Sequence, residues 1–274
     1  MKYEGDIGLY LSGCAVPIKE CNILLHQPKV RDVALFGEGA FFSACQMLSD
    51  IPNFVKDIKQ GNSELKDRND FQIFVEVLNV EQTGLFTAIK PFFSLCCPDF
   101  DVRPKKKSID LEREGNVVGR LTQMNYTSFS RTVRELYLPR TDDEEPEYNY
   151  DKNNKAAVAL AEKIKKNREK LKKATSSDSN SVGSVLAFYT SCLSLGMGMN
   201  VNTFYDYTLF QLYDAFSRYM AKAESDQFRQ IQLMPFADTS DMEAPETWMR
   251  NLYCEPKRKY NSFGKFNEAM GKKK

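Results

Sequence analysis

The chain contains a single histidine, and this limits the chemistry that its side chains can do. His26 lies where an apolar run meets a proline, so neither an HExxH zinc site nor any multi-histidine metal site can be assembled. A nucleophilic pair of His26 with Cys21 or Cys45 is formally available, because a histidine can activate a thiol. The residues around these cysteines match no nucleophile motif. We therefore expect structural thiols and an ordinary loop histidine.

Phosphate-binding and acid–base patterns are also incomplete. FGEGAFF and LGMGMN each hold two glycines two positions apart, but no third glycine or lysine–serine pair follows, as a phosphate loop requires. Acidic residues cluster in DDEE and IDLERE, where solvated carboxylates would keep ordinary pKa values. The sequence therefore predicts no enzyme, no catalytic residue, no cofactor and no bound metal.

Composition restricts the partners and the compartment. The 38 lysines and arginines nearly balance 37 acidic residues, so no net field draws the chain to nucleic acid or anionic lipid. No window reaches the roughly 18 to 20 apolar residues that a membrane helix needs, and the first residues do not resemble a signal peptide. The seven cysteines lack paired-ligand spacing, which is typical of buried free thiols in a reducing cytosol. We expect a soluble, non-secreted protein without a membrane partner.

The hydrophobic pattern predicts a first domain of mixed structure over residues 1–140. Short strands are expected at IGLYL, AVPIK and CNILL, followed by two helices broken near Gly37. The apolar residues of these two helices are spaced three and four apart: Val33, Leu35, Phe36, Phe41, Cys45 and Leu48. The expected start of the fold is a small sheet covered by helices.

The rest of this domain alternates helices and strands. NDFQIFVEVLN fits both strand and helix spacing, and we favour the helix; LFTAIKPFFSLCCPDF predicts a buried helix kinked at Pro91. FDVRP, SIDLE and NVVGRL predict a small antiparallel meander with an exposed tip at Lys105–Lys107. NYTSFSRTVRELYL predicts a closing helix that Asn125 or Thr127 could cap.

Composition changes beyond residue 140. Residues 141–182 join an acidic stretch to a long, mostly basic helix and are predicted to form a linker. A helical module over 183–254 and a flexible basic tail over 255–274 are expected to follow. The predicted fold class is α+β and predominantly helical, with a small N-terminal sheet with helices, a charged helical linker and a C-terminal helical module. The basic helix offers three candidate partner contacts: Lys163, Lys166 and Arg168.

Seven aromatic residues crowd into residues 201–220. A helix capped by Thr208 would place one continuous apolar face inward: Leu209, Leu212, Tyr213, Phe216 and Met220. Its outward residues would be Gln211, Asp214 and Arg218. The rings that precede the cap are expected to pack over its first turn: Phe204, Tyr205 and Tyr207. We predict a core rather than a ligand box, with Phe204, Tyr205, Leu209, Leu212, Tyr213 and Phe216 critical for folding.

These residues also carry a family resemblance. NTFYDYTLFQLYDAFSRYMAKAESDQFRQIQLM resembles the C-terminal module of tail assembly chaperones of tailed bacteriophages, in which an aromatic start leads into a helix. YLSGCAVPIKECNILL and GNVVGRLTQMNYTSFSRTVRELYLPR resemble the N-terminal part of that group, and the charged segment between them resembles its linker. Together these segments cover most of the chain, but none of them is an invariant signature.

The resemblance implies a non-enzymatic late protein of the host bacterial cytoplasm. Such a chaperone binds the tape-measure protein and recruits tail-tube subunits during virion assembly through protein–protein interaction. The alternative is a structural tail or baseplate component that is retained in the virion. An adaptor that binds nucleic acid through the basic helix is less favoured, because no interleaved aromatic residues offer base stacking; an enzyme of unfamiliar type ranks last. Trp248 is a further candidate partner contact, with a core position as the more frequent role for tryptophan.

Overall fold

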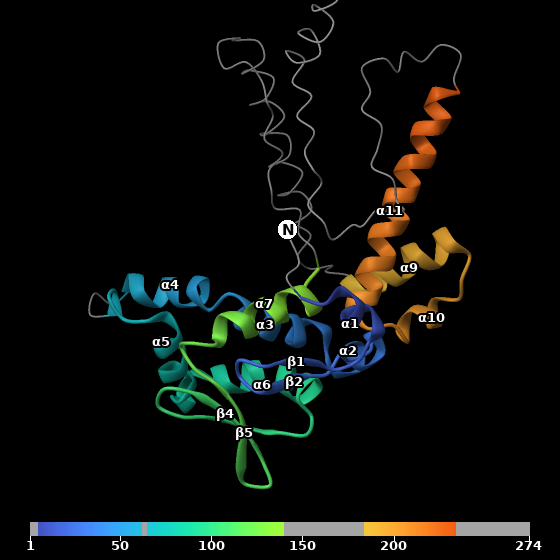
Figure 1. The fold of residues 1–274 in the computed structure, drawn as a ribbon. Coiled ribbons are helices and arrows are strands. Elements are labelled where there is room, and N and C mark those ends of the chain that lie inside the picture. The colour runs from blue at the N-terminus through green and yellow to red at the C-terminus, as the bar shows by residue number, and fades with distance from the viewer. Residues whose placement is uncertain (1–4, 62–64, 140–183, 234–274) are drawn as a thin grey trace, which may run out of the picture.

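The computed structural model describes residues 5–61, 65–139 and 184–233 (Figure 1). Its fold is α+β and mostly helical, which confirms the predicted class. The first half contains α1 (Ile7–Ser12), β1 (Val16–Ile18), β2 (Ile23–Leu25), α2 (Val30–Phe36), α3 (Glu38–Ser49), α4 (Ile51–Gly61) and α5 (Asp70–Leu78). After α5 the chain forms η2 (Glu81–Thr83), α6 (Leu85–Cys96), β3 (Asp101–Pro104), β4 (Ile109–Arg113), β5 (Asn116–Leu121), α7 (Tyr126–Tyr137), α9 (Val185–Met197), α10 (Val201–Tyr205) and α11 (Leu209–Gln232).

Two small antiparallel sheets form within residues 16–121. In the first, β1 pairs with β2, and Val16 lies opposite Leu25. In the second, β4 lies between β3 and β5, with a register shift at Leu111/Glu112. The predicted meander is therefore confirmed, and its tip at Lys105–Lys107 is exposed as expected.

The segment IGLYL was expected to be a strand, but it forms the helix α1. The Asp6 side chain accepts a hydrogen bond from the Leu9 amide at 3.2 Å, which caps the start of the helix. Gly13 ends it in the left-handed region at φ 72°. Of the six residues only Tyr10 is buried, so the apolar run is not a strand that is buried on both faces. Caps at both ends thus determine the local structure.

The centre of the core is aromatic and lies between α3, α6 and α7. Phe92 of α6, which is a helix with Pro91 inside it as predicted, contacts Tyr137 with ring centroids 5.6 Å apart and Phe129 at 5.9 Å. Phe41 of α3 meets the Tyr137 ring at 6.0 Å. All four rings are buried. The helix favoured for NDFQIFVEVLN is confirmed as α5.

The apolar face expected on α2 is only partly buried. Val30 and Val33 are fully buried, whereas Leu35 is 84% exposed and Phe36 is also exposed. The helix has seven residues, and Gly37 follows its last residue, Phe36. Leu35 and Phe36, which were counted among the apolar residues at helical spacing, therefore lie outside the core.

Residues 184–233 share one hydrophobic core with residues 7–137. The Tyr213 hydroxyl donates to the Tyr137 carbonyl at 3.3 Å, and the Val30 amide donates to the Tyr207 carbonyl at 2.8 Å. The Gln211 amide donates to the Leu11 carbonyl at 2.7 Å. The first turns of α11 therefore lie within the body, while its later turns project from it (Figure 1). The domain boundaries predicted at 140 and 182 fall outside the described residues.

The burial of α11 differs from the expected single face. Asp214 is buried and its carboxylate accepts from Arg218 at 3.1 Å, although both were expected to point outward. Phe210 is buried against Tyr10, with ring centroids 5.2 Å apart. Met220 is exposed rather than inward. Besides α9, α11 contacts both α1 and α7, so more than one side of the helix is covered.

Candidate protein-binding surface

The environment of His26 does not place a thiolate beside the imidazole. The His26 Nε2 atom lies 3.7 Å from an Asp99 carboxylate oxygen. The backbone of His26 is held at both ends, because its amide donates to the Cys96 carbonyl at 2.8 Å and its carbonyl accepts from the Tyr137 hydroxyl at 2.8 Å. These contacts give the histidine a structural position in the loop that leads to α2.

Burial makes most of the described thiols poor nucleophiles. It raises the pKa of Cys21 to about 11 and that of Cys97 to about 12. The pKa values of Cys45 and Cys96 lie well above the ordinary value for the same reason. Since the thiolate is the reactive form, neither Cys21 nor Cys45 is suited to pair with a histidine at neutral pH. Contrary to the expected burial of the cysteines, Cys14 is exposed.

One carboxylate of IDLERE departs from the ordinary pKa expected for it. Burial by itself would raise the pKa of Asp110, but hydrogen bonds from Arg120 and Ser108 together outweigh it and hold the pKa below its usual range. The Arg120 Nε atom donates at 2.8 Å and the Ser108 hydroxyl at 2.8 Å. The bond from Arg120 ties β4 to β5. The carboxylate is fully engaged in holding the sheet together, so its role is structural.

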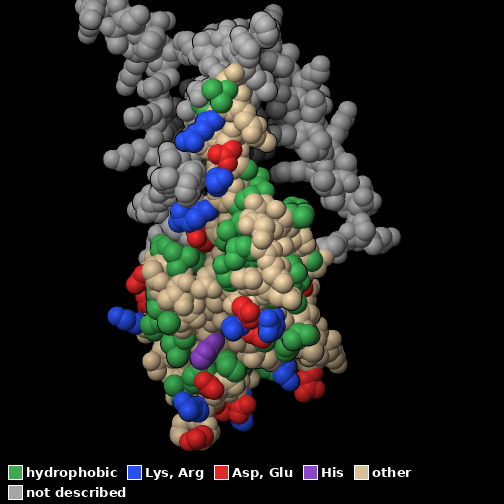
Figure 2. All heavy atoms as spheres, turned by 90° about the vertical axis from the view of Figure 1, so that its right-hand side faces the viewer, with side chains coloured by type: hydrophobic (Ala, Val, Ile, Leu, Met, Phe, Trp, Pro, Cys, Tyr) green, Lys and Arg blue, Asp and Glu red, His purple; other side chains and the backbone are tan. Residues whose placement is uncertain are grey.

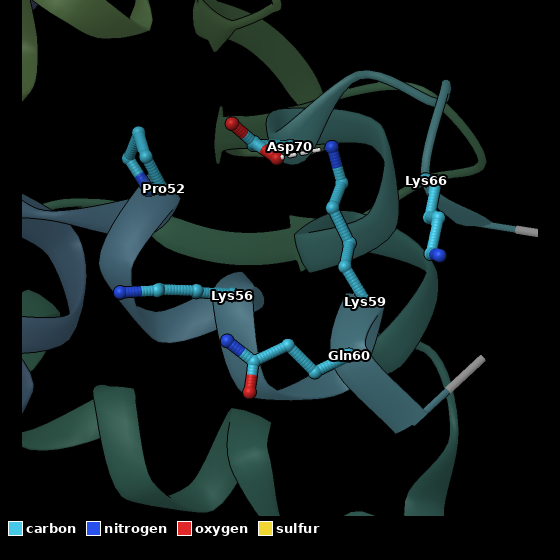
Figure 3. Close-up of a pocket in the computed structure, with 6 residues that line it drawn as sticks. All are labelled: Pro52, Lys56, Lys59, Gln60, Lys66 and Asp70. Atoms are coloured by element: carbon cyan, nitrogen blue, oxygen red, sulfur yellow. Dashed lines mark ion pairs between the residues drawn. The ribbon is translucent and has the colours of Figure 1, made fainter. Parts of the chain in front are cut away.

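A shallow depression beside α4 gathers charged side chains without making them converge (Figure 3). It encloses about 350 Å³. The Lys59 ammonium lies 2.7 Å from an Asp70 carboxylate oxygen and donates to the Arg68 carbonyl at 2.6 Å, so its charge is already neutralised. Lys56 and Lys66 extend in different directions from the backbone (Figure 3). In the parts of the chain that the structure describes, no group of three or more His, Cys, Asp or Glu could hold a metal ion.

The helix α9 is held in a defined position on the body of the protein. Its first turn is anchored by Glu38 of α3, whose carboxylate accepts from the Leu186 amide at 3.2 Å and from the Ser184 hydroxyl. Ser184 in turn accepts from the Ala187 amide at 2.9 Å. A carboxylate at a helix N-terminus satisfies free amides and complements the helix dipole. The start of α9 is therefore held against the core.

Packing against the core and α11 fixes the rest of α9. Leu186, Thr190 and Leu193 are completely buried. Gly196 lies so close to α11 that a Cβ atom there would be 2.1 Å from the Tyr219 ring. The helix ends at Met197, and Gly198 caps it in the left-handed region at φ 64°. Two sides of α9 are thus covered, and the remaining side faces outward.

The outward side of α9 and the turn into α10 form an apolar surface. We call it the α9–α10 surface, and its exposed residues are Val185, Phe188, Leu195, Met197, Met199 and Val201. Residues 179–205 contain no charged side chain, in a chain where 27% of residues are charged. Figure 2 faces this side: hydrophobic side chains gather below the projecting α11, and charged side chains lie along α11 and lower on the body. A group of exposed apolar side chains with no charge among them is typical of an interaction site.

The residues predicted to be critical for folding lie under this surface. Phe204, Leu209, Leu212 and Tyr213 are buried, and Tyr205 and Phe216 are half-buried. Phe216 contacts the rings of Phe188 and Tyr189 with centroids 6.1 and 4.6 Å away. Their importance for folding stays a prediction. The expected partner contacts Lys163, Lys166, Arg168 and Trp248 lie outside the described residues.

The α9–α10 surface was not predicted from the sequence. A helical module was expected over residues 183–254, but the outward exposure of apolar residues on α9 was not. The long interval without charge was the available signal, since an all-apolar helix is either buried or presented to a partner.

The fold and this surface define the class of protein. It is a mostly helical α+β protein that presents an uncharged apolar surface. Comparisons with protein-family models, with curated proteins and with solved structures found no match. None of the described helices combines the length and the apolar character needed to cross a membrane.

Proposed function

We propose that the protein is a non-enzymatic chaperone that binds other proteins through the α9–α10 surface. The observation that carries the proposal is the exposure of this uncharged surface on a rigidly anchored helix. Met197 and Met199 flank Gly198 at its turn, and methionine side chains adapt to irregular apolar partners. A surface of this type suits a client that offers apolar side chains before its own assembly is complete.

The particular role proposed is that of a tail assembly chaperone of a tailed bacteriophage, acting in the host bacterial cytoplasm. The family resemblance of the sequence supports this role, and its clients would be the tape-measure protein and tail-tube subunits. Exposed apolar segments of such subunits would aggregate if left uncovered. Binding them reversibly would keep them available until the tail is built.

The alternative is a structural tail or baseplate component that remains in the virion. It would use the same apolar surface in a permanent interface, which is larger and more hydrophobic than a transient one. The two roles predict different fates for the protein, because a chaperone leaves before the particle is complete.

Co-purification tests both roles. The full chain is co-expressed with the other late gene products of its source genome, and mass spectrometry identifies what it retains and whether it occurs in purified particles. Retention of a long coiled-coil protein together with absence from particles supports the chaperone. Presence in particles supports the structural component, and retention of no phage protein contradicts both.

A pair of variants links the result to the surface. Met197→Glu with Met199→Glu places charge on the turn and is expected to reduce client retention by about tenfold or more. The matched control is Met124→Glu, because Met124 is 94% exposed, lies before α7 and is not one of the residues of the α9–α10 surface. Equal retention by the double variant and the wild type would contradict the proposed surface.

A further inference from the structure

The outward side of α9 carries a symmetric order of large and small side chains. Phe188 is 59% exposed and Leu195 is 87% exposed, and seven residues, two helical turns or about 10.5 Å, separate them. Between them lie the small residues Ser191, which is exposed, and Cys192, which is half-buried. The order large, small, small, large reads the same in both chain directions. We call these four residues the α9 seam.

A second α9 seam fits the first when the two helices run antiparallel. A twofold axis that passes between Ser191 and Cys192 brings Phe188 of one copy beside Leu195 of the other, and the reverse. The small residues at the centre allow the helix backbones to approach closely, while the large residues fill the space on either side. This is the self-complementary pattern that an isologous interface requires, with side chains interlocking as in paired helices.

The absence of charge favours a second copy as the occupant. In a twofold contact the seam of each copy meets the same seam, so a charge on it would be buried in both copies without an opposite charge from the partner, which is destabilising. Residues 179–205 contain no charge, and the seam can therefore meet itself without this penalty. The seam is also preformed, because Glu38 and the buried residues of α9 hold the helix in place. A rigid surface loses little entropy on binding.

We propose that the protein forms a twofold symmetric dimer through the α9 seam. The dimer covers Phe188 and Leu195 of both copies. It leaves Met197, Met199 and Val201, at the turn into α10, available to another partner. Dimerisation rests on the seam alone and holds whether or not the protein binds phage clients.

The first test is the mass of the full chain in solution. Sedimentation equilibrium over a range of concentrations is expected to show a monomer–dimer equilibrium for the wild type. Leu195→Glu should weaken the dimer by about tenfold or more, because it buries an unpaired carboxylate against Phe188 of the other copy. Met124→Glu, the same change at an exposed residue before α7, should leave the dimer unchanged. Circular dichroism checks that both variants keep the helical content of the wild type.

The second test uses the position of Cys192 beside the twofold axis. A bismaleimide with a short spacer adds to two thiols and should link two chains through Cys192. Cys192→Ser is expected to abolish the linked dimer, whereas Cys14→Ser, at the exposed thiol near α1, should retain it. This readout does not depend on the stability of a charged variant.

Three outcomes overturn the proposal. The first is a monomeric mass at every concentration, which would leave the seam to a client or to another segment of this chain. The second is a dimer that Leu195→Glu does not weaken. The third is cross-linking that survives Cys192→Ser. None of these results bears on the retention of phage proteins, so failure of the dimer and failure of the proposed chaperone role are separable.

Discussion

At the scale of single residues, the contacts of Asp110 illustrate how burial and hydrogen bonds compete. The carboxylate is buried, which disfavours its charge, yet Arg120 and Ser108 donate to it and lower its pKa. From the sequence IDLERE, Asp110 was expected to be a solvated carboxylate with an ordinary pKa. The difference arises because Arg120 lies on β5, directly opposite Asp110 in the sheet register.

The lowered pKa of Asp110 makes its contribution to stability dependent on acid. The contribution is present above the unfolded pKa, which is about 3.9, and is lost as pH falls through the lower folded pKa. Asp110→Asn should reduce the free energy of unfolding at neutral pH by about 1 kcal/mol, since solvent screens the arginine side. Urea unfolding measured from pH 7 down to pH 3 should show a shallower acid dependence for the variant. The exposed Asp101→Asn serves as the control, and identical acid dependence of Asp110→Asn and wild type would contradict the assignment.

Gly119 lies where the structure leaves no room for a side chain. An alanine Cβ there would lie 2.8 Å from the Asn22 carbonyl oxygen, which is backbone and cannot move aside freely. Gly119→Ala should lower the free energy of unfolding by about 1–3 kcal/mol. Gly39→Ala in α3, where no atom lies within 4 Å of the added methyl group, should raise it by about 0.5–1 kcal/mol through helix propensity. Denaturant unfolding compares the two, and equal effects would show that β5 does not approach the turn after β1 so closely.

At the scale of elements, α9 depends on a residue far away in the chain. Its own Ser184 provides a local cap, and Glu38 adds a second acceptor from the first turn of α3. The start of α9 is therefore capped both by a residue next to it in the chain and by a residue of a distant helix. Because the α9–α10 surface and the α9 seam both lie on this helix, the Glu38 contact also holds the proposed binding surfaces in place.

Loss of the Glu38 carboxylate should loosen the start of α9. Glu38→Ala is expected to reduce stability by about 0.5–2 kcal/mol, as removal of a helix cap does. Hydrogen exchange should accelerate at the Leu186 amide more than at amides of α3. Glu20→Ala, at an exposed residue of the turn between β1 and β2, is the control. Unchanged exchange at Leu186 would argue against the capping role.

At the scale of the whole molecule, residues 184–233 and the residues before 140 bury their apolar side chains together. Leu212 is completely buried at the base of α11, and the Tyr213 hydroxyl reaches the end of α7. A shared core makes unfolding cooperative, because neither part can open without exposing the other.

A core substitution at α11 should therefore destabilise both parts. Leu212→Ala is expected to cost about 2–5 kcal/mol and to lower hydrogen-exchange protection in α3 as well as in α9. A single calorimetric transition should describe the unfolding of these regions. Loss of protection confined to α9, α10 and α11, with α3 unaffected, would show that the two parts unfold separately.

The sequence alone predicted much of the secondary structure, because helix and strand periodicity are local properties. The spacing in NDFQIFVEVLN and the strands around Lys105–Lys107 were enough to find α5 and the meander. It also indicated that the rings near Phe204 form core. Local pattern failed at α1, where an apolar run resembled a strand and capping residues decided the outcome.

Tertiary structure decided which apolar and charged side chains are covered. Leu35 is exposed, Asp214 is buried and Phe188 faces outward, although the sequence pattern suggested otherwise or was silent. Periodicity identifies one side of a helix, but the number of sides that neighbours cover depends on elements distant in the chain. The α9–α10 surface exists for that reason: α3, α11 and the core cover the other sides of α9, and the fold places nothing among its described residues over the last one.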